Sequence, residues 1–71
     1  MISDRLDKLV DEMVDREIRF EDAVREFEKR FIGRMLGCCD GSLTRTADRL
    51  GIHRNTLTRK MTEYKLRRHA S

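Results

Sequence analysis

The sequence predicts an all-α protein with four helices per chain, and three observations support this prediction. The 71 residues include no proline, few aromatic residues and 41% charged residues, a composition that favours charged helices over strands. Apolar residues recur at steps of three and four along most of the chain, which is the spacing of helical faces. A glycine turn near the C-terminus separates the last two helical segments.

The first predicted helix runs from Ser3 to about Asp15, and Ser3 or Asp4 is expected to cap its N-terminus. Its apolar residues fall on one stripe, with charged residues on the other faces. This stripe consists of Leu6, Leu9, Val10, Met13 and Val14. Residues 16–19 are expected to form a loop.

The second predicted helix begins at Phe20 or Glu21 and ends near Cys38, just before the turn signal Asp40-Gly41. Its apolar residues are also read as a single stripe. They are Phe20, Ala23, Val24, Phe27, Phe31, Met35 and Leu36.

Residues 42–66 carry the pattern of a helix-turn-helix. Ser42 stands at an N-cap position, and Gly51 follows the first short helix where a departing chain favours positive φ. A second short helix is predicted over residues 54–64. The inward positions of the two helices are Leu43, Ala47, Leu50, Leu57, Met61 and Tyr64. The outward positions of the second helix are Arg54, Asn55, Thr58, Arg59 and Thr62, none of which is acidic.

The two long helices carry more apolar surface than two short helices can cover. A chain this small usually also needs support from disulfides, a metal or a second chain. We therefore expect residues 1–39 to pack against a second copy as an intertwined four-helix core, stabilised mainly by burial of apolar area. The expected dimerisation residues are Leu6, Leu9, Val10, Met13, Phe20, Val24, Phe27 and Phe31. A monomeric four-helix bundle is the alternative.

Charge is divided unevenly between the two halves of the chain. Residues 1–32 hold ten acidic and seven basic side chains, whereas residues 33–71 hold three acidic and nine basic ones. The basic half also carries the helix-turn-helix pattern. A charged surface that simply faces solvent is the plain interpretation, but the coincidence of charge and motif favours a polyanionic partner.

The segment TRTADRLGIHRNTLTRKMTEYKL, with FEDAVREFEKRFIGRML before it, resembles the Fis family of DNA-binding proteins. The same helix-turn-helix closes the NtrC-type regulators. The likeness covers about residues 20–66, and the run Leu-Gly-Ile-x-Arg-x-Thr-Leu at residues 50–57 is its most specific part. It implies a homodimer that places recognition helices 54–64 in adjacent major grooves and bends the DNA.

The resemblance also implies roles for individual residues. Arg54 matches a base-reading arginine that can donate two hydrogen bonds to guanine. His53 stands where the family has an Asn or Ser cap, which predicts capping weaker by up to about 1 kcal/mol. Lys65 replaces a common glycine. The full set of expected DNA-binding residues is Ser42, Thr44, Arg45, His53, Arg54, Asn55, Thr56, Thr58, Arg59 and Lys60.

These observations predict three segments: dimerisation helices at 1–39, a DNA-binding motif at 40–66 and a basic tail at 67–71. The predicted function is that of a homodimeric, sequence-preferring DNA-binding protein, either a transcription regulator or a small nucleoid protein. Double-stranded DNA is the expected partner, with the transcription machinery as a further one. A helical protein-interaction module that regulates a transcription complex without direct DNA binding is the alternative.

The sequence gives no sign of catalysis, cofactors or metal binding. It has no Cys/His dyad at workable spacing and no glycine-rich phosphate loop. Cys38 and Cys39 have no second pair nearby, so we interpret them as small filler side chains at a helix end. No apolar run approaches the roughly 20 residues of a membrane span. Acidic residues near the N-terminus replace the apolar stretch of a signal peptide, which predicts a cytoplasmic protein. The resemblance to the Fis family implies that it is nucleoid-associated.

Overall fold

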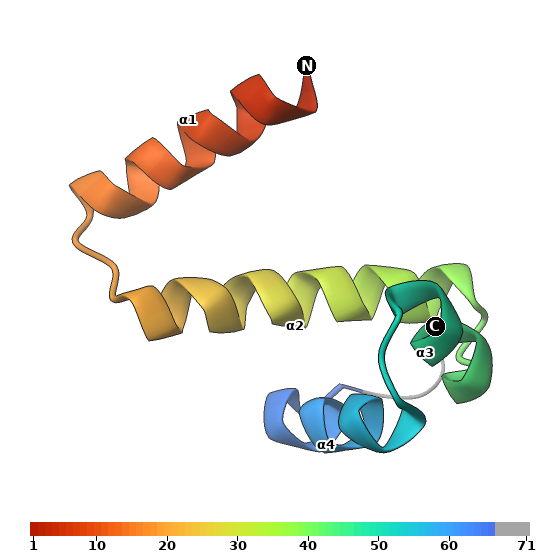
Figure 1. Cartoon of the computed structure of the whole chain (residues 1–71). Coiled ribbons are helices and arrows are strands. Elements are labelled where there is room, and N and C mark those ends of the chain that lie inside the picture. The colour runs from red at the N-terminus through yellow and green to blue at the C-terminus, as the bar shows by residue number, and fades with distance from the viewer. Residues whose placement is uncertain (67–71) are drawn as a thin grey trace.

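Four helices account for most of residues 1–66, the part of the chain that the computed structural model describes (Figure 1). They are α1 (Ile2–Asp15), α2 (Phe20–Cys38), α3 (Leu43–Leu50) and α4 (Arg54–Tyr64). This range contains no strand, so the predicted all-α fold is confirmed. None of these helices is long and apolar enough to span a membrane. The basic tail predicted at residues 67–71 lies outside the described residues.

The buried core lies where α3 and α4 pack against the second half of α2 (Figure 1). Its buried apolar residues are Ile32, Leu36, Ala47, Leu57, Met61 and Tyr64. Leu43, Leu50, Ile52 and Leu66 pack around them and remain partly exposed. The inward positions predicted for α3 and α4 are therefore confirmed, and α2 supplies the platform on which both helices rest.

The turn between α3 and α4 has the geometry that its sequence predicts. Gly51 adopts a φ of 75°, in the left-handed region where glycine is unstrained. The backbone N–H groups of Gly51 and Ile52 both donate to the carbonyl of Ala47, at 2.9 and 3.1 Å. Ala47 is 4% exposed, and its small side chain lets the two helices approach closely.

The single apolar stripe predicted for α2 is wrong, because the helix presents two separate apolar faces. Ile32 and Leu36 are 5% and 3% exposed beneath α3 and α4. Phe27 and Phe31 point elsewhere and are 56% and 47% exposed, with ring centroids 5.2 Å apart. Each residue of an α-helix is rotated by about 100° from the one before it, so Phe31 and Ile32 face different surroundings.

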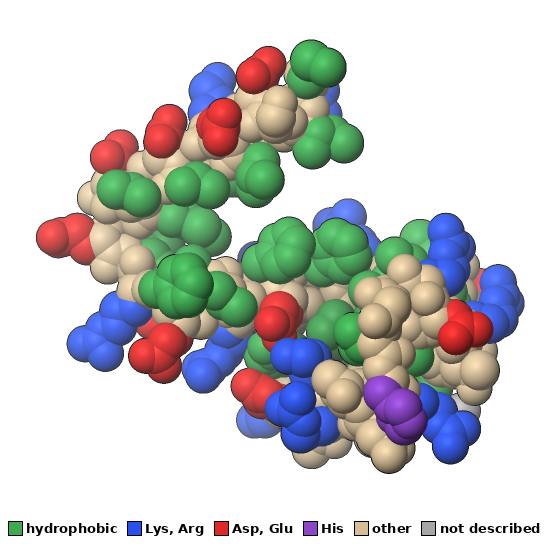
Figure 2. Space-filling view, in the orientation of Figure 1, with side chains coloured by type: hydrophobic (Ala, Val, Ile, Leu, Met, Phe, Trp, Pro, Cys, Tyr) green, Lys and Arg blue, Asp and Glu red, His purple; other side chains and the backbone are tan. Residues whose placement is uncertain are grey.

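The first two helices form an open hairpin in which α1 turns back over α2 (Figure 1). We call its apolar surface the hairpin face: Leu6, Leu9, Val10, Met13, Val14, Phe20, Val24, Phe27 and Phe31. All of these except the half-buried Met13 are at least 38% exposed, and α1 buries no residue. Figure 2 shows apolar side chains gathered on the sides of α1 and α2 that look toward each other. One chain therefore leaves this surface uncovered.

The predicted cap of α1 is wrong. The helix begins at Ile2 with Met1 at the N-cap position, and no side chain caps it. A capping side chain has to belong to the residue just before the helix. Ser3 and Asp4 instead lie within the first turn of α1. The Met1 ammonium lies 3.7 Å from the Asp4 carboxylate, but both groups are at least 80% exposed. An exposed ion pair of this kind contributes little to stability.

Gly33 offers a test of how α2 is stabilised. Glycine inside a helix is less favourable than alanine by about 0.5–1 kcal/mol, and an added Cβ here would meet Leu66 Cδ2 at 3.9 Å, an ordinary contact. We expect Gly33→Ala to raise the free energy of unfolding by about 0.5–1 kcal/mol, measured by urea denaturation at fixed protein concentration.

The matched control for this prediction is Gly51→Ala. An added Cβ at Gly51 would meet no atom within 4 Å, but its φ of 75° strains any other residue. The same substitution should therefore lower the free energy of unfolding by about 1 kcal/mol. Equal effects of the two variants would contradict this explanation.

Candidate nucleic-acid interface

Each helix of the helix-turn-helix begins at a side-chain cap. Ser42 Oγ accepts a hydrogen bond from the Arg45 backbone N–H at 3.3 Å, as its predicted position requires. His53 Nδ1 accepts one from the Asn55 backbone N–H at 3.0 Å, so α4 is capped although histidine replaces the expected residue type. The caps fix where the chain enters α3 and α4.

Most of the side chains predicted to bind DNA lie on the surface of α3, α4 and the turn between them. Seven are exposed: Thr44, Arg45, His53, Arg54, Asn55, Thr58 and Arg59. Ser42, Thr56 and Lys60 are half-buried. The hydroxyls of Thr58 and Thr62 donate to backbone carbonyls one turn earlier, at 3.0 and 3.1 Å. Within residues 1–66, no acidic side chain forms an ion pair with Arg45 or Arg54.

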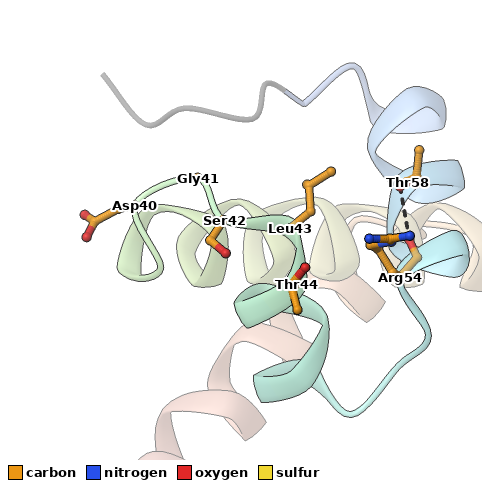
Figure 3. Close-up of a pocket in the computed structure, with 7 residues that line it drawn as sticks. All are labelled: Asp40, Gly41, Ser42, Leu43, Thr44, Arg54 and Thr58. Carbon is orange, nitrogen blue, oxygen red and sulfur yellow. Dashed lines mark hydrogen bonds between the residues drawn. The ribbon is translucent and has the colours of Figure 1, made fainter.

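An open hollow of about 560 Å³ lies where the start of α3 meets the start of α4 (Figure 3). It is lined by Asp40, Gly41, Ser42, Leu43, Thr44, Arg54 and Thr58. Four of the predicted residues therefore meet here, although they come from two separate helices. The first turn of a helix exposes backbone N–H groups that suit an anion, and Arg54 adds a cationic side chain beside them.

Asp40 is the acidic exception at this hollow, and the sequence indicated only a turn at that position. It adopts a φ of 54°, which is tolerated better by aspartate than by most residues. Figure 3 shows its carboxylate pointing away from the other labelled side chains. Asp40 therefore lies at the edge of the hollow, and its carboxylate does not point into it.

Arg59 belongs to the exposed part of α4, one turn before the acidic Glu63. Its guanidinium Nη1 lies 4.0 Å from Glu63 Oε1, and the two side chains are 66% and 44% exposed. Exposed pairs within one helix contribute a few tenths of a kcal/mol. Glu63 therefore does little to hold Arg59, which remains accessible to an anionic partner.

Lys60 differs from the other predicted DNA-binding residues, because its side chain has a partner on another helix. Its Nζ donates to Glu28 Oε1 on α2 at 2.7 Å, and the Tyr64 hydroxyl donates to the same oxygen at 2.6 Å. We call Glu28, Lys60 and Tyr64 the clasp. The Lys60 and Glu28 side chains are only 22% and 29% exposed. The predicted contact between Lys60 and phosphate stays a prediction.

The clasp was not predicted from the sequence, although the residue spacing carries a signal for it. Glu28 stands four and eight residues before Ile32 and Leu36, which places this acid on the buried face of α2. Lys60 and Tyr64 are likewise one helical turn apart on α4. An acid on a core-facing position, with donors at matching spacing on another helix, indicates such a contact.

The clasp shifts the pKa values of two of its members. The hydrogen bond from Lys60, followed by that from Tyr64, holds the pKa of the Glu28 carboxyl below its ordinary value of 4.5. The hydrogen bond that the Tyr64 hydroxyl donates to the Glu28 carboxylate raises the pKa of Tyr64 to about 12. Ionising Tyr64 would remove the donated proton and place two negative oxygens side by side.

The cysteines take no part in this interface. Cys39 is buried and Cys38 is exposed, and both are free thiols. In the described range, no group of three His, Cys, Asp or Glu side chains is arranged to hold a metal ion.

A comparison with known families finds a match. Residues 23–64 match the family described as bacterial regulatory protein, Fis family. The matched segment covers more than half of the chain and ends at the last residue of α4. Neither a curated protein nor a solved structure matches the chain.

The pKa shifts predict how stability depends on pH. The Glu28 contribution is complete above its ordinary pKa of 4.5 and is lost as pH falls through the lower folded value. The Tyr64 contribution is complete below pH 10.0 and is lost as pH rises toward about 12. We therefore expect Glu28→Gln to lower the free energy of unfolding near neutral pH, and to flatten its pH dependence at both extremes, in urea titrations.

Glu26→Gln is the matched control for this prediction. Glu26 lies on the same helix, and its Oε1 accepts from Arg30 Nη1 at 2.6 Å, but both side chains are largely exposed. We expect this variant to keep the loss of stability between pH 10.0 and about 12 that Tyr64 causes. Identical pH profiles for Glu28→Gln and the unmodified protein would contradict the assignment.

Proposed function

Because the chain belongs to the Fis family of bacterial regulatory proteins, we propose that it binds duplex DNA as a homodimer, prefers certain sequences and bends the duplex. The family and its helix-turn-helix identify the chain as a DNA-binding regulatory protein. The proposal of a dimer that prefers certain sequences and bends DNA is supported by the presence of two exposed surfaces in one chain. One is the basic and hydroxyl-rich surface of α3 and α4, and the other is the hairpin face.

In this proposal α4 is the recognition helix that enters the major groove. Arg54 is its first residue and is exposed, so its guanidinium can reach the N7 and O6 acceptors of guanine. Asn55, beside it, can bond to adenine in the same groove. Thr44, Arg45, Thr56 and Arg59 are proposed to hold phosphates, with Ser42, His53 and Thr58 at the edge of the contact. The N-terminus of α3 adds backbone donors to the phosphate contacts.

The hairpin face supports the proposed dimer. Complete burial of one large apolar side chain is worth about 1.5–3 kcal/mol, and one chain leaves most of this face in water. A second copy carries the same face, so two open hairpins can cover each other in a four-helix core. In this proposal residues 1–39 dimerise, residues 40–66 bind DNA and the tail at 67–71 adds positive charge.

Bending follows in this proposal from a fixed distance between the two recognition helices. A rigid core holds both copies of α4, so the duplex has to deform where its grooves do not match their separation. The deformation energy depends on the sequence being bent, which supplies preference at base pairs that the protein does not touch. We further propose that the protein acts at the nucleoid, where the transcription machinery is a second partner.

We expect DNA binding to depend steeply on salt concentration. Two substitutions should distinguish residues that read bases from residues that bind phosphates. We expect log K to fall by about 0.9 per neutralised phosphate for each unit of log salt, measured by fluorescence anisotropy. Arg54→Ala should weaken binding to the preferred sequence by about 1–3 kcal/mol and relax preference at one base. Arg45→Ala should weaken binding to all sequences about equally.

Arg30→Ala is the control, because Arg30 is 71% exposed on α2 and lies outside the proposed interface. It removes one positive charge and should leave sequence preference unchanged. Equal weakening of all sequences by Arg54→Ala would contradict base reading by this residue. A folded dimer that binds no duplex at physiological salt would instead favour the protein-interaction module.

The dimer is tested by sedimentation equilibrium at micromolar concentration. We expect a species of twice the 8.5 kDa chain mass. Phe27→Glu places a carboxylate at the hairpin face and should leave 8.5 kDa chains, because an unpaired charge would be buried in the dimer. Lys29→Glu places the same group on the other side of α2 and should leave the dimer intact. A single species at 8.5 kDa for the unmodified protein would exclude the dimer.

A further inference from the structure

The clasp supplies all the polar side-chain contacts between distant segments of residues 1–66. Its two hydrogen bonds join residues 32 and 36 positions apart. Every other side-chain hydrogen bond or ion pair in this range joins residues at most four positions apart. Apart from the clasp, α2 and α4 are held together by apolar packing.

Apolar packing and hydrogen bonds constrain a helix differently. The hydrophobic effect is non-directional, so apolar burial by itself fixes the direction of a helix less sharply than a hydrogen bond does. A hydrogen bond weakens steeply when its angle falls. The clasp anchors α4 at two positions one turn apart, Lys60 and Tyr64, and both anchors meet the single Oε1 atom of Glu28. These bonds therefore restrict the direction of α4 as well as its distance from α2.

The position of Glu28 connects the two surfaces that the proposed function uses. It directly follows Phe27 of the hairpin face and stands one turn before Ile32 of the buried core. On α4, Arg54 stands six residues before Lys60, about 9 Å along the helix axis. The clasp thus links the helix that carries the hairpin face to the helix that carries Arg54.

We propose that the clasp sets the direction of α4 on α2 and thereby determines which half-site spacing the dimer accepts. This inference rests on the proposed dimeric DNA-binding function. The eleven residues of α4 span about 16 Å, so a tilt of about 10° moves one end by about 3 Å. That displacement is close to the rise of one base pair, about 3.4 Å. Glu28, Lys60 and Tyr64 are positioning residues, because they act through the placement of α4.

The test compares Tyr64→Phe and Glu28→Gln with the unmodified protein. The first keeps the buried ring and removes its hydroxyl, and the second keeps the shape of the side chain and removes its charge. Binding is measured on duplexes whose two half-sites are moved apart or together by one and two base pairs. We expect the preference for the best spacing to fall by about tenfold in both variants. A factor of about ten corresponds to the free-energy contribution of one hydrogen bond to a charged group.

Two comparisons separate positioning from a general loss of stability. Glu26→Gln removes an exposed ion pair from the same helix and should leave spacing preference unchanged. All binding measurements are made at temperatures at which circular dichroism shows each variant to be fully folded. The base preference conferred by Arg54 should persist in each variant. Unchanged spacing preference in both clasp variants would overturn the proposal, even if their melting temperatures fall.

A measurement without DNA distinguishes this proposal from the proposed function. Amide residual dipolar couplings report the direction of α4 relative to α2 in the free protein. We expect one alignment tensor to fit both helices in the unmodified protein and in Glu26→Gln, and a reduced degree of order for α4 in the two clasp variants. Unchanged couplings would overturn the orienting role of the clasp while leaving DNA binding intact. Failure of the unmodified protein to bind DNA would overturn the proposed function and the spacing effect together.

Discussion

The constraint on which the structure depends is that α2 presents apolar side chains on two sides at once. Its Ile32 and Leu36 form the floor of the core beneath α3 and α4, whereas Phe27 and Phe31 project from another side. Because both sets lie on one continuous helix, whatever covers the phenylalanines is rigidly connected to the DNA-binding motif. The clasp strengthens this connection where the two sides of α2 meet, since Glu28 stands between Phe27 and Phe31 along the chain.

Local signals in the sequence were sufficient to predict the helix-turn-helix. Ser42 caps α3 and Gly51 ends it with a left-handed residue, and both features depend on the chemistry of a few neighbouring residues. The predicted bounds of α4, residues 54–64, agree with the structure for the same reason. The hairpin also agrees in helix type, because its apolar residues recur with a clear helical period.

The features that were not predicted depend on contacts between distant segments, which local patterns specify less directly. The division of α2 into two faces is decided by which side α3 and α4 occupy, and the buried side is the one that carries Glu28 rather than the phenylalanines. The clasp is likewise a tertiary contact: Tyr64 was expected in the core, and it is buried, but its hydroxyl bonds to an acid 36 residues away. Lys65 is a local exception to this rule. It adopts a left-handed φ of 57° at the end of α4, where glycine is the common residue, and the Leu66 backbone N–H donates to the Met61 carbonyl at 2.8 Å.

The open hairpin explains why folding and DNA binding are expected to be linked in the proposed dimer. An isolated helix of 14 residues is marginal in water, and α1 buries no side chain within its own chain. Its stability therefore has to come from apolar packing against another surface, and the second copy offers that surface in matching form. In the proposed dimer, association covers the apolar side of α1 together with Phe27 and Phe31 of α2 in the same step. Because α2 also carries the platform for α4, the two copies of α4 would gain a defined separation only in the proposed dimer.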